Sequence, residues 1–198
     1  MEKSERLSEI LRNNKGFLKT SEAAAAGVSR TYLGKFVRDN GLERVAQGLY
    51  MSEDAWMDGL FVLQARFPRA VFSHETALYL LDLAEREPLK YSVTIKTDAS
   101  ATNLIKSGAK VYKIKDSLHS LGITALDTPA GHKVIAYGAE RTICDLIRSR
   151  ATLDIQEYQS AIHGYLRMKD KDLNLLIHYA KQFHVEKILR SHLEVLFP

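Results

Sequence analysis

The 198-residue sequence predicts an α+β protein, in which short helices and a β-ribbon precede a small β-sheet and a C-terminal helical bundle. Three patterns predict this fold. Two helical segments joined at Gly27 are followed by a short ribbon that ends at Met51. From Leu89 onward, apolar and polar residues alternate as they do in strands. After Gly138 the apolar residues return to helical spacing.

The first predicted helix covers residues 3–13 and carries apolar side chains at helical spacing. We expect Thr20 or Ser21 to cap a second helix, because a hydroxyl there can accept a hydrogen bond from a free backbone N–H. Gly27 ends that helix, since glycine enters the left-handed region without a Cβ penalty. Ser29 is then expected to cap a third helix.

The third helix is predicted to bury Leu33, Phe36 and Val37 and to expose a polar face. Asn40-Gly41 ends it, and residues 42–51 read as a two-stranded ribbon. Two helices and a ribbon after an N-terminal helix make a winged helix-turn-helix, whose second hairpin helix enters the DNA major groove. A helix–Gly–helix hairpin with a charged outer face is also common as a plain structural element, so both interpretations stay open on this pattern alone.

The side chains predicted to contact DNA are polar or basic. They lie before the hairpin, on its second helix or on the wing: Lys19, Ser29, Arg30, Thr31, Tyr32, Lys35, Arg38, Arg44 and Gln47. Those at the start of the second helix are expected to reach base edges or flanking phosphates. The other lysines and arginines are expected mainly to anchor the DNA backbone.

Three regions are predicted: a DNA-binding module, a pair of connecting helices and an α+β domain, at residues 1–51, 52–88 and 89–198. Ser52 is expected to cap a helix that runs through Ala65 and turns Trp56 inward. Ser73 is expected to cap the next helix.

The α+β domain is expected to contain four strands and then helices to the end of the chain. The first strand alternates apolar residues with Ser92, Thr94 and Lys96, which predicts one polar face. The last strand is almost entirely apolar and is predicted to be central. The strands are predicted at residues 91–96, 109–115, 122–126 and 132–137, with a helical turn at 103–106.

The composition limits the classes of function and partner that we expect. A net charge of +4 and a pI near 9.1 favour a polyanionic partner without establishing one. A single cysteine excludes a disulfide framework and a multi-cysteine zinc site, and the seven histidines show no ligand spacing, so no metal or cofactor is predicted. No apolar run reaches membrane-spanning length and the charged N-terminus is unlike a signal peptide, so we expect a cytoplasmic protein without a membrane partner.

Enzyme chemistry finds little support. The sequence has no glycine-rich phosphate loop and no Gly-x-Ser-x-Gly. Asp98, Asp116 and Asp127 lie at predicted strand ends, where nucleases and nucleotidyltransferases bind metals, but aspartate is also an ordinary turn residue. Cys144 is expected to be a small buried hydrophobe. We predict no catalytic residue.

Two further charged features need an explanation. Arg141 and Asp145 are four residues apart and are expected to pair on a helix surface. Six lysines of the strand region either form a patch for phosphate or an acidic partner, or protect solvated edge strands: Lys90, Lys96, Lys106, Lys110, Lys113 and Lys115. The last residues, 193–198, resemble a protease recognition sequence with proline in place of glutamine, and no function is assigned to them.

Three segments carry a resemblance to a known family. They are LKTSEAAAAGVSRTYLGKFVRDNGLERVAQGLYM, VFSHETALYLLDL and GAERTICDLIR. With these segments the chain resembles the AbiEi family, the abortive-infection antitoxins of bacterial type IV toxin–antitoxin systems. The resemblance spans most of the chain, and its most specific parts are the wing ending in Gly-Leu-Tyr and the Glu-Arg-Thr-x-x-Asp run.

The resemblance implies a phage-defence antitoxin that represses its own operon by binding inverted repeats in promoter DNA. It also implies that the C-terminal domain counteracts a nucleotidyltransferase-type toxin, without a stable complex between the two proteins. Two other classes stay open. One is a nuclease or nucleotidyltransferase that the winged helix brings to nucleic acid, and the other is a transcriptional regulator that senses a small ligand.

Overall fold

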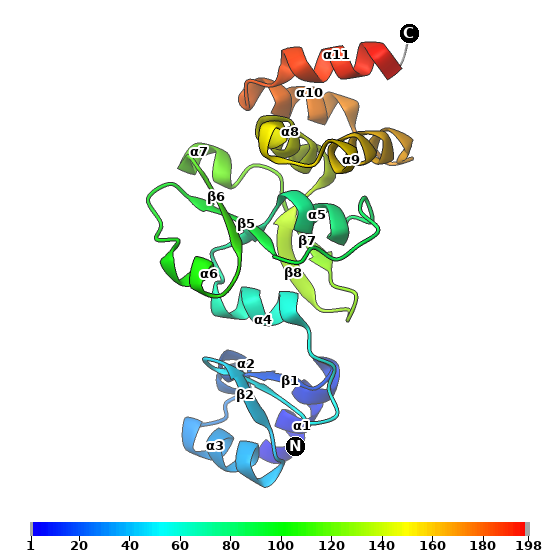
Figure 1. The fold of residues 1–198 in the computed structure, drawn as a ribbon. Helices are drawn as coiled ribbons and strands as arrows, with labels where there is room; N and C mark the ends of the chain where they lie inside the picture. The colour runs from blue at the N-terminus through cyan, green and yellow to red at the C-terminus, as the bar shows by residue number, and fades with distance from the viewer. Residues whose placement is uncertain (1, 197–198) are drawn as a thin grey trace. The chain divides into compact units, whose positions relative to one another are not determined.

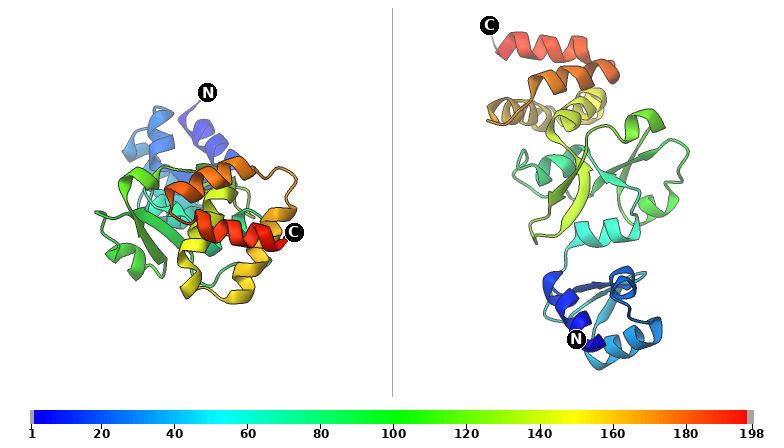
Figure 2. Two further views of the ribbon diagram at one scale, coloured as in Figure 1. Left: turned by 90° about the horizontal axis from the view of Figure 1, so that it is seen from above. Right: turned by 180° about the vertical axis from the view of Figure 1, so that it is seen from behind.

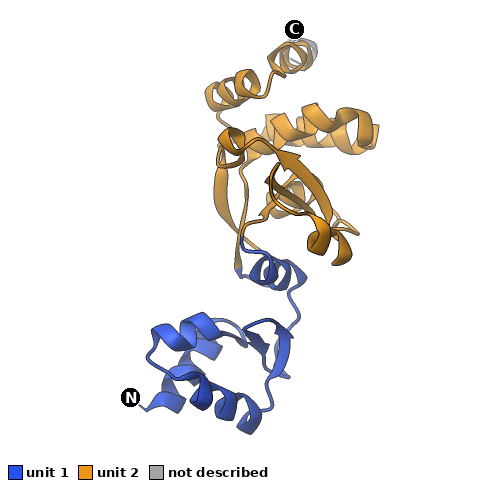
Figure 3. Cartoon of the chain, turned by 90° about the vertical axis from the view of Figure 1, so that its left-hand side faces the viewer, with its two compact units in different colours: residues 1–68, 128–132 blue, residues 69–127, 133–198 orange. Residues whose placement is uncertain are grey.

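The computed structural model describes residues 2–196, with side chains described through Leu193, and the chain forms two compact units (Figure 3). The first unit is Met1–Pro68 with Thr128–His132, and the second is Arg69–Asp127 with Lys133–Pro198. The stretch expected to connect two domains, 52–88, is therefore divided between the units. Residues 197 and 198 of the protease-like sequence lie outside the described residues.

The first unit contains helices around a small antiparallel sheet (Figure 1). Its elements are α1 (Lys3–Asn13), β1 (Phe17–Lys19), α2 (Thr20–Ala25), α3 (Arg30–Asp39), β2 (Glu43–Ala46), β3 (Leu49–Met51) and α4 (Gly59–Arg66). The sheet order is β1-β3-β2, so the predicted ribbon gains a third strand in which Phe17 faces Met51. This is the expected winged helix-turn-helix arrangement.

Local signals set the turn between α2 and α3 as expected. Gly27 has a φ of +75° and the Val28 N–H donates to the Ala23 carbonyl at 2.9 Å, which closes the end of α2. The Ser29 hydroxyl accepts from the Tyr32 N–H at 3.3 Å and caps α3.

The expected cap of α2 is wrong. Thr20 and Ser21 lie inside the helix, and Lys19 occupies the capping position. The Glu22 carboxylate accepts from the Lys19 N–H at 3.3 Å and from the Asn14 side-chain amide at 2.8 Å. The carboxylate in the first turn thus bonds back to the backbone N–H of the capping residue, as the second half of a capping box does.

The helix expected to start at Ser52 is also shorter than predicted. α4 begins after Asp58, whose carboxylate accepts from the Phe61 N–H at 3.0 Å and caps it. The Ser52 N–H donates instead to the Gly16 carbonyl at 2.9 Å, which holds this segment against the end of α1. Trp56, expected to face inward, is 87% exposed.

The second unit contains a five-stranded sheet and most of the helices. Its elements are β4 (Val71–Phe72), α5 (His74–Leu80), β5 (Ser92–Lys96), α6 (Thr102–Lys106), β6 (Lys110–Ile114), α7 (Asp116–His119), β7 (Ile123–Asp127), β8 (Lys133–Tyr137), α8 (Ala139–Ser149), a 3-10 turn (Arg150–Thr152), α9 (Ile155–Arg167), α10 (Leu173–Gln182) and α11 (Glu186–Leu196). The strand order is β6-β5-β4-β8-β7, so β8 is an interior strand and the two-residue β4 is the central one.

The helices of the second unit build its core in layers. α8 packs on α5, α9 and α10 pack on α8, and α11 packs on α10 (Figures 1 and 2). Their buried faces form one continuous apolar cluster that includes Ile143, Ile147, Tyr165 and Leu176. β5 and β6 run parallel and are joined through α6.

Candidate nucleic-acid interface

Helix α3 has two distinct faces. Leu33 and Phe36 are buried in the core of the first unit. The residues predicted to meet DNA lie on the other side, where Ser29, Arg30, Thr31, Lys35 and Arg38 are exposed. The ten-residue helix carries three basic side chains and one acid, Asp39, at its last position. This face can therefore offer cations and a hydroxyl to a polyanion without a competing acid in its first turns.

Tyr32 differs from its neighbours on α3. Its side chain is half-buried and packs against the apolar cluster of the first unit. The Lys3 Nζ lies 5.8 Å from the centre of its ring. Lys3 of α1 is thus a further cation beside the start of α3, which no local pattern in the sequence indicates because the contact joins two helices.

Gly34 lies four residues from both Arg30 and Arg38, on the same side of α3. A Cβ placed there would meet only the Arg38 Nη1, at 3.9 Å, so packing within the unit does not demand glycine. Glycine in a helix interior is unfavourable, but it lets another backbone approach closely. The face of α3 therefore has a bare patch between two arginines.

The wing presents the two side chains predicted for it. Arg44 and Gln47 are exposed, and the Arg44 Nε donates to the Ala46 carbonyl at 3.4 Å across a register shift in β2. Gly48 in the turn has a φ of +71°. Its carbonyl accepts from the Thr20 N–H at 2.8 Å, so the wing is fixed to the start of α2.

Lys19 differs from the exposed residues of α3 and the wing because its side chain has an aromatic partner within the first unit. Its side chain is half-buried, and its Nζ is 4.4 Å from the centre of the Phe61 ring in α4. A cation over an aromatic face gains about 0.5–1 kcal/mol at an exposed site and more when desolvated. Part of the attraction expected between Lys19 and DNA is therefore satisfied inside the unit.

The six lysines of the strand region do not share one face. Lys110 and Lys113 are three apart on β6 and point to opposite sides of the sheet. The Lys110 Nζ lies 2.6 Å from the Glu75 Oε1, and Lys96 pairs with Asp116. Lys90, Lys106, Lys113 and Lys115 are exposed.

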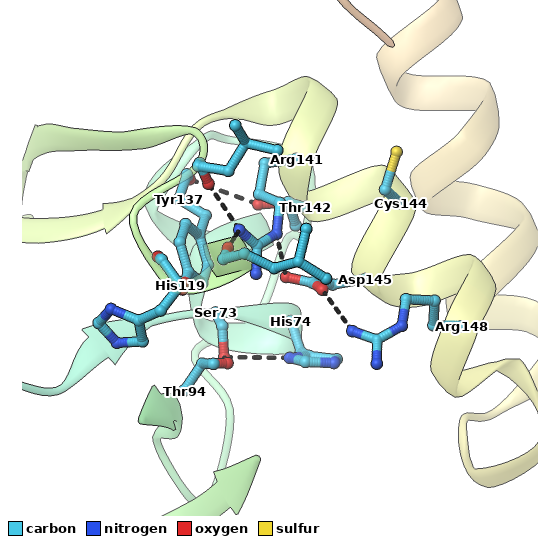
Figure 4. Close-up of polar contacts among 12 residues, drawn as sticks. Ser73, His74, Thr94, His119, Tyr137, Arg141, Thr142, Cys144, Asp145 and Arg148 are labelled. Atoms are coloured by element: carbon cyan, nitrogen blue, oxygen red, sulfur yellow. Dashed lines mark hydrogen bonds and ion pairs between the residues drawn. The ribbon is translucent and has the colours of Figure 1, made fainter. Parts of the chain in front are cut away.

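Arg141 and Asp145 do pair, but inside the second unit and not on its surface (Figure 4). Arg141 is fully buried, and its Nε donates to the Asp145 Oδ2 at 3.0 Å. Its Nη1 donates to the Leu118 and Leu121 carbonyls at 2.7 and 2.5 Å. Burial raises the pKa of Asp145, and the guanidinium groups of Arg141 and Arg148 oppose that rise. The Glu-Arg-Thr-x-x-Asp run therefore has a structural role, because Arg141 holds the segment before β7 in place.

Two of the three residues of the polar face expected for the first strand of the sheet are buried as well, while Lys96 is exposed. Ser92 and Thr94 lie beneath α5, where the Ser92 hydroxyl donates to the Glu75 Oε2 at 2.7 Å. The Thr94 hydroxyl donates to the Ser73 hydroxyl at 2.8 Å. Ser73 therefore bonds within the core and does not cap α5 with its side chain. Alternation marked the strand correctly but could not show that α5 covers its polar side.

The remaining side chains considered for metal binding or catalysis do not form one site. Asp116 and Asp127 pair with Lys96 and Lys133, and Asp98 is exposed. Cys144 is buried, and burial raises its pKa to about 12, which agrees with a role as a small hydrophobe. Among the described residues, no group of three or more His, Cys, Asp or Glu side chains is placed to hold a metal ion. No helix in the described range is both long and apolar enough to span a membrane.

The first unit is a winged helix-turn-helix of the kind found in transcriptional regulators. Residues 5–52 match a family model described as the transcriptional regulator AbiEi antitoxin, which confirms the resemblance to that family over this segment. The crystal structure of the RV2827C protein from Mycobacterium tuberculosis is similar in fold, with a TM-score of 0.54 and 15% identity over 89% of this chain and 71% of that one. A comparison with curated proteins finds no significant match.

Proposed function

We propose that this chain is a DNA-binding repressor of its own toxin–antitoxin operon and the antitoxin of that system. The exposed polar face of α3 carries the proposal, because it lies within the segment that matches the AbiEi regulator family. The proposed target is promoter DNA with inverted repeats, in the cytoplasm. Two copies of the chain would occupy the two half-sites.

The proposed contacts follow from the positions on α3 and the wing. Arg30 and Thr31 lead the helix into the major groove, where an arginine can donate two hydrogen bonds to one guanine. Lys35 and Arg38, farther along the helix, neutralise phosphates and set the register on the duplex. Arg44 and Gln47 of the wing contact the backbone or the adjacent minor groove. This assigns DNA binding to residues 1–51.

The antitoxin activity is assigned to residues 89–198, joined to the DNA-binding module by 52–88. Two observations support this assignment. The family model that matches residues 5–52 describes an antitoxin, and the second unit, which lies outside that match, has its own apolar core. We propose that it opposes a nucleotidyltransferase-type toxin without forming a stable complex, as part of phage defence.

Arg30→Ala tests the placement of the recognition helix. We expect it to weaken binding to the DNA upstream of the gene by roughly 1–3 kcal/mol and to reduce the preference over a scrambled duplex, because a base contact is lost. Fluorescence anisotropy titrations at several salt concentrations measure both quantities. Arg86→Ala is the matched control, since it removes one charge from an exposed residue of the second unit.

Each result has a clear meaning. If the preference for the upstream DNA over the scrambled duplex falls in Arg30→Ala but persists in Arg86→Ala, the result supports sequence recognition by α3. Equal, salt-sensitive binding of the unchanged protein to both duplexes would show that only a basic surface exists. Unaltered affinity and preference in Arg30→Ala would refute the proposed orientation of α3.

A further inference from the structure

A small basic pocket lies within the second unit, beyond the carboxyl ends of the parallel strands β5 and β6. Its volume is about 260 Å³. The polar side chains in its lining come from segments far apart in the sequence: Thr97, Lys113, Lys115, Arg148, Gln182 and His184. No carboxylate contributes to the lining, so the pocket presents positive charge to whatever enters it.

The two lysines of the lining keep their charge available. Both are exposed, and within the described part of the chain neither forms an ion pair. The Lys113 Nζ donates to the Thr97 carbonyl at 3.2 Å, a neutral acceptor that holds the ammonium group without neutralising it. Thr97 follows β5 directly and Lys115 follows β6, so the strand ends bring the two segments together.

Arg148 adds a third cation whose charge is not cancelled. Its Nη1 is 3.5 Å from the Asp145 Oδ1, but the fully buried Arg141 already holds the other oxygen of that carboxylate at 3.0 Å (Figure 4). Two guanidinium groups share one carboxylate, which leaves one net positive charge. Of the two, only Arg148 is exposed and lines the pocket.

The wall of the pocket is held in place. The Phe183 ring lies 4.3 Å from the Arg141 Cζ and 5.5 Å from the Arg148 Cζ, so a buried cation and the pocket cation both contact it. His184 follows with a φ of +56°, a conformation that side chains other than glycine rarely adopt. This left-handed residue closes the C-terminus of α10, where the Val185 N–H donates to the Ala180 carbonyl at 2.9 Å.

From this arrangement we infer that the pocket binds the phosphate or pyrophosphate group of a small molecule. Carboxyl ends of parallel strands are the usual ligand edge of α/β sheets, and β5, α6 and β6 form one such crossover. Pockets for whole drug-sized ligands measure about 300–1,000 Å³, so this smaller one suits the anionic group alone, with any remainder of the ligand outside. The inference is independent of DNA binding by α3.

Isothermal titration calorimetry of the full chain with inorganic phosphate, pyrophosphate and ATP tests the inference. We expect saturable binding of at least one of them. The double variant Lys113→Gln/Lys115→Gln should weaken that binding at least tenfold, because two of the three uncancelled cations are removed. The control Lys90→Gln/Lys106→Gln removes the same charge from exposed lysines outside the lining and should bind as the unchanged protein does. Thermal unfolding of all variants verifies that they are folded.

The three probes separate the possible sources of the anion. Tightest binding of phosphate or pyrophosphate indicates a site for the free ion, and tightest binding of ATP indicates a phosphorylated molecule. Absence of saturable binding by all three overturns the inference, and so does an equal loss in both double variants. A third result would also refute the pocket. If the unchanged protein binds no phosphate, but the Lys113/Lys115 double variant binds a scrambled DNA duplex more weakly than the unchanged protein does, this region is a nucleic-acid surface.

Discussion

His74 shows how the second unit accommodates polar side chains in its core. The imidazole Nδ1 lies 3.0 Å from the Ser73 Oγ, and the Nε2 lies 3.1 Å from the Ser149 Oγ. Its ring stacks on Tyr112 with the centroids 3.5 Å apart. Burial lowers the pKa of His74 to about 3, with Lys110 and the arginines acting in the same direction and Glu75 opposing them. The residue is therefore neutral in the folded protein at any ordinary pH.

This pKa makes stability depend on pH. An unfolded histidine has a pKa of about 6.5, so the unfolded state takes up the proton first as the solution is acidified. The free energy of unfolding should be level above about pH 6.5 and should fall between pH 6.5 and 3, by about 2 kcal/mol at pH 5. Urea unfolding at pH 7.5 and 5.0 measures the change.

His74→Gln isolates the contribution of this residue. The variant should lose less stability between pH 7.5 and 5.0 than the unchanged protein. Some dependence on pH should remain, because burial also lowers the pKa of His119 and of His192. An identical loss of stability in both proteins would show that His74 is accessible to protons in the folded state.

Arg141 illustrates why a short motif need not mark a contact surface. Its guanidinium lies 3.8 Å from the centre of the Tyr137 ring and bonds two carbonyls and one carboxylate. Gly122 passes so close that a Cβ there would approach the Arg141 Cβ to 2.6 Å. Removal of one partner of a buried ion pair leaves an uncompensated charge. The Glu-Arg-Thr-x-x-Asp run therefore belongs to the architecture of the second unit.

At the scale of elements, α3 combines a poor helix residue with a surface proposed to bind DNA. Gly34→Ala should raise the free energy of unfolding by about 0.5–1 kcal/mol, because alanine is the better helix former and the added Cβ meets no close neighbour. If the bare patch lets α3 approach the duplex, the same variant should bind operator DNA roughly tenfold more weakly, about 1.4 kcal/mol.

The two measurements for Gly34→Ala are urea unfolding and an anisotropy titration on one preparation. A rise in the free energy of unfolding together with a fall in DNA affinity distinguishes the loss of a DNA contact from damage to the fold. A more stable variant with undiminished affinity would mean that Gly34 does not face the DNA backbone. A less stable variant would contradict the assignment of Gly34 to an open helix surface.

The elements that the sequence predicted well are governed by neighbours along the chain. The cap at Ser29 and the turn at Gly27 each depend on a few adjacent residues, and both lie where they were expected. The strands β5 to β8 and the helical segment after Gly138 were also found, because their alternation or helical spacing spans enough residues to be distinctive. The candidate DNA-binding face followed from the same local patterns.

The elements that escaped prediction depend on distant partners. β4 has only two residues, and its place at the centre of the sheet comes from pairing with β5 and β8. The Asp58 carboxylate accepts from the Thr128 hydroxyl at 2.5 Å and lies 2.8 Å from the His132 Nδ1, more than sixty residues farther along the chain. These bonds draw residues 128–132 into the first unit. The basic pocket likewise joins strand ends to α8 and α10, which no spacing rule connects.

At the scale of the whole molecule, each unit has a separate apolar core. The cluster around Leu7, Leu33 and Phe36 lies wholly within the first unit, and the cluster around Ile143 and Leu176 wholly within the second. A substitution on the exposed face of α3 leaves both cores intact. Repression and toxin neutralisation, as proposed, should therefore be separable by surface substitutions in the full chain.

The double variant Arg30→Ala/Lys35→Gln tests this separation. Expressed from an unrelated promoter, it should no longer repress a reporter placed behind the operon's own promoter, because the proposed base and phosphate contacts are lost. It should still restore growth to cells that express the toxin from the downstream gene. Immunoblotting verifies that the variant proteins are present in equal amounts. The control is Arg86→Ala/Lys90→Gln, which removes two charges from exposed residues of the second unit. Loss of growth rescue together with repression, at equal protein levels, would mean that DNA binding and neutralisation share one surface and that the antitoxin activity extends to the first unit.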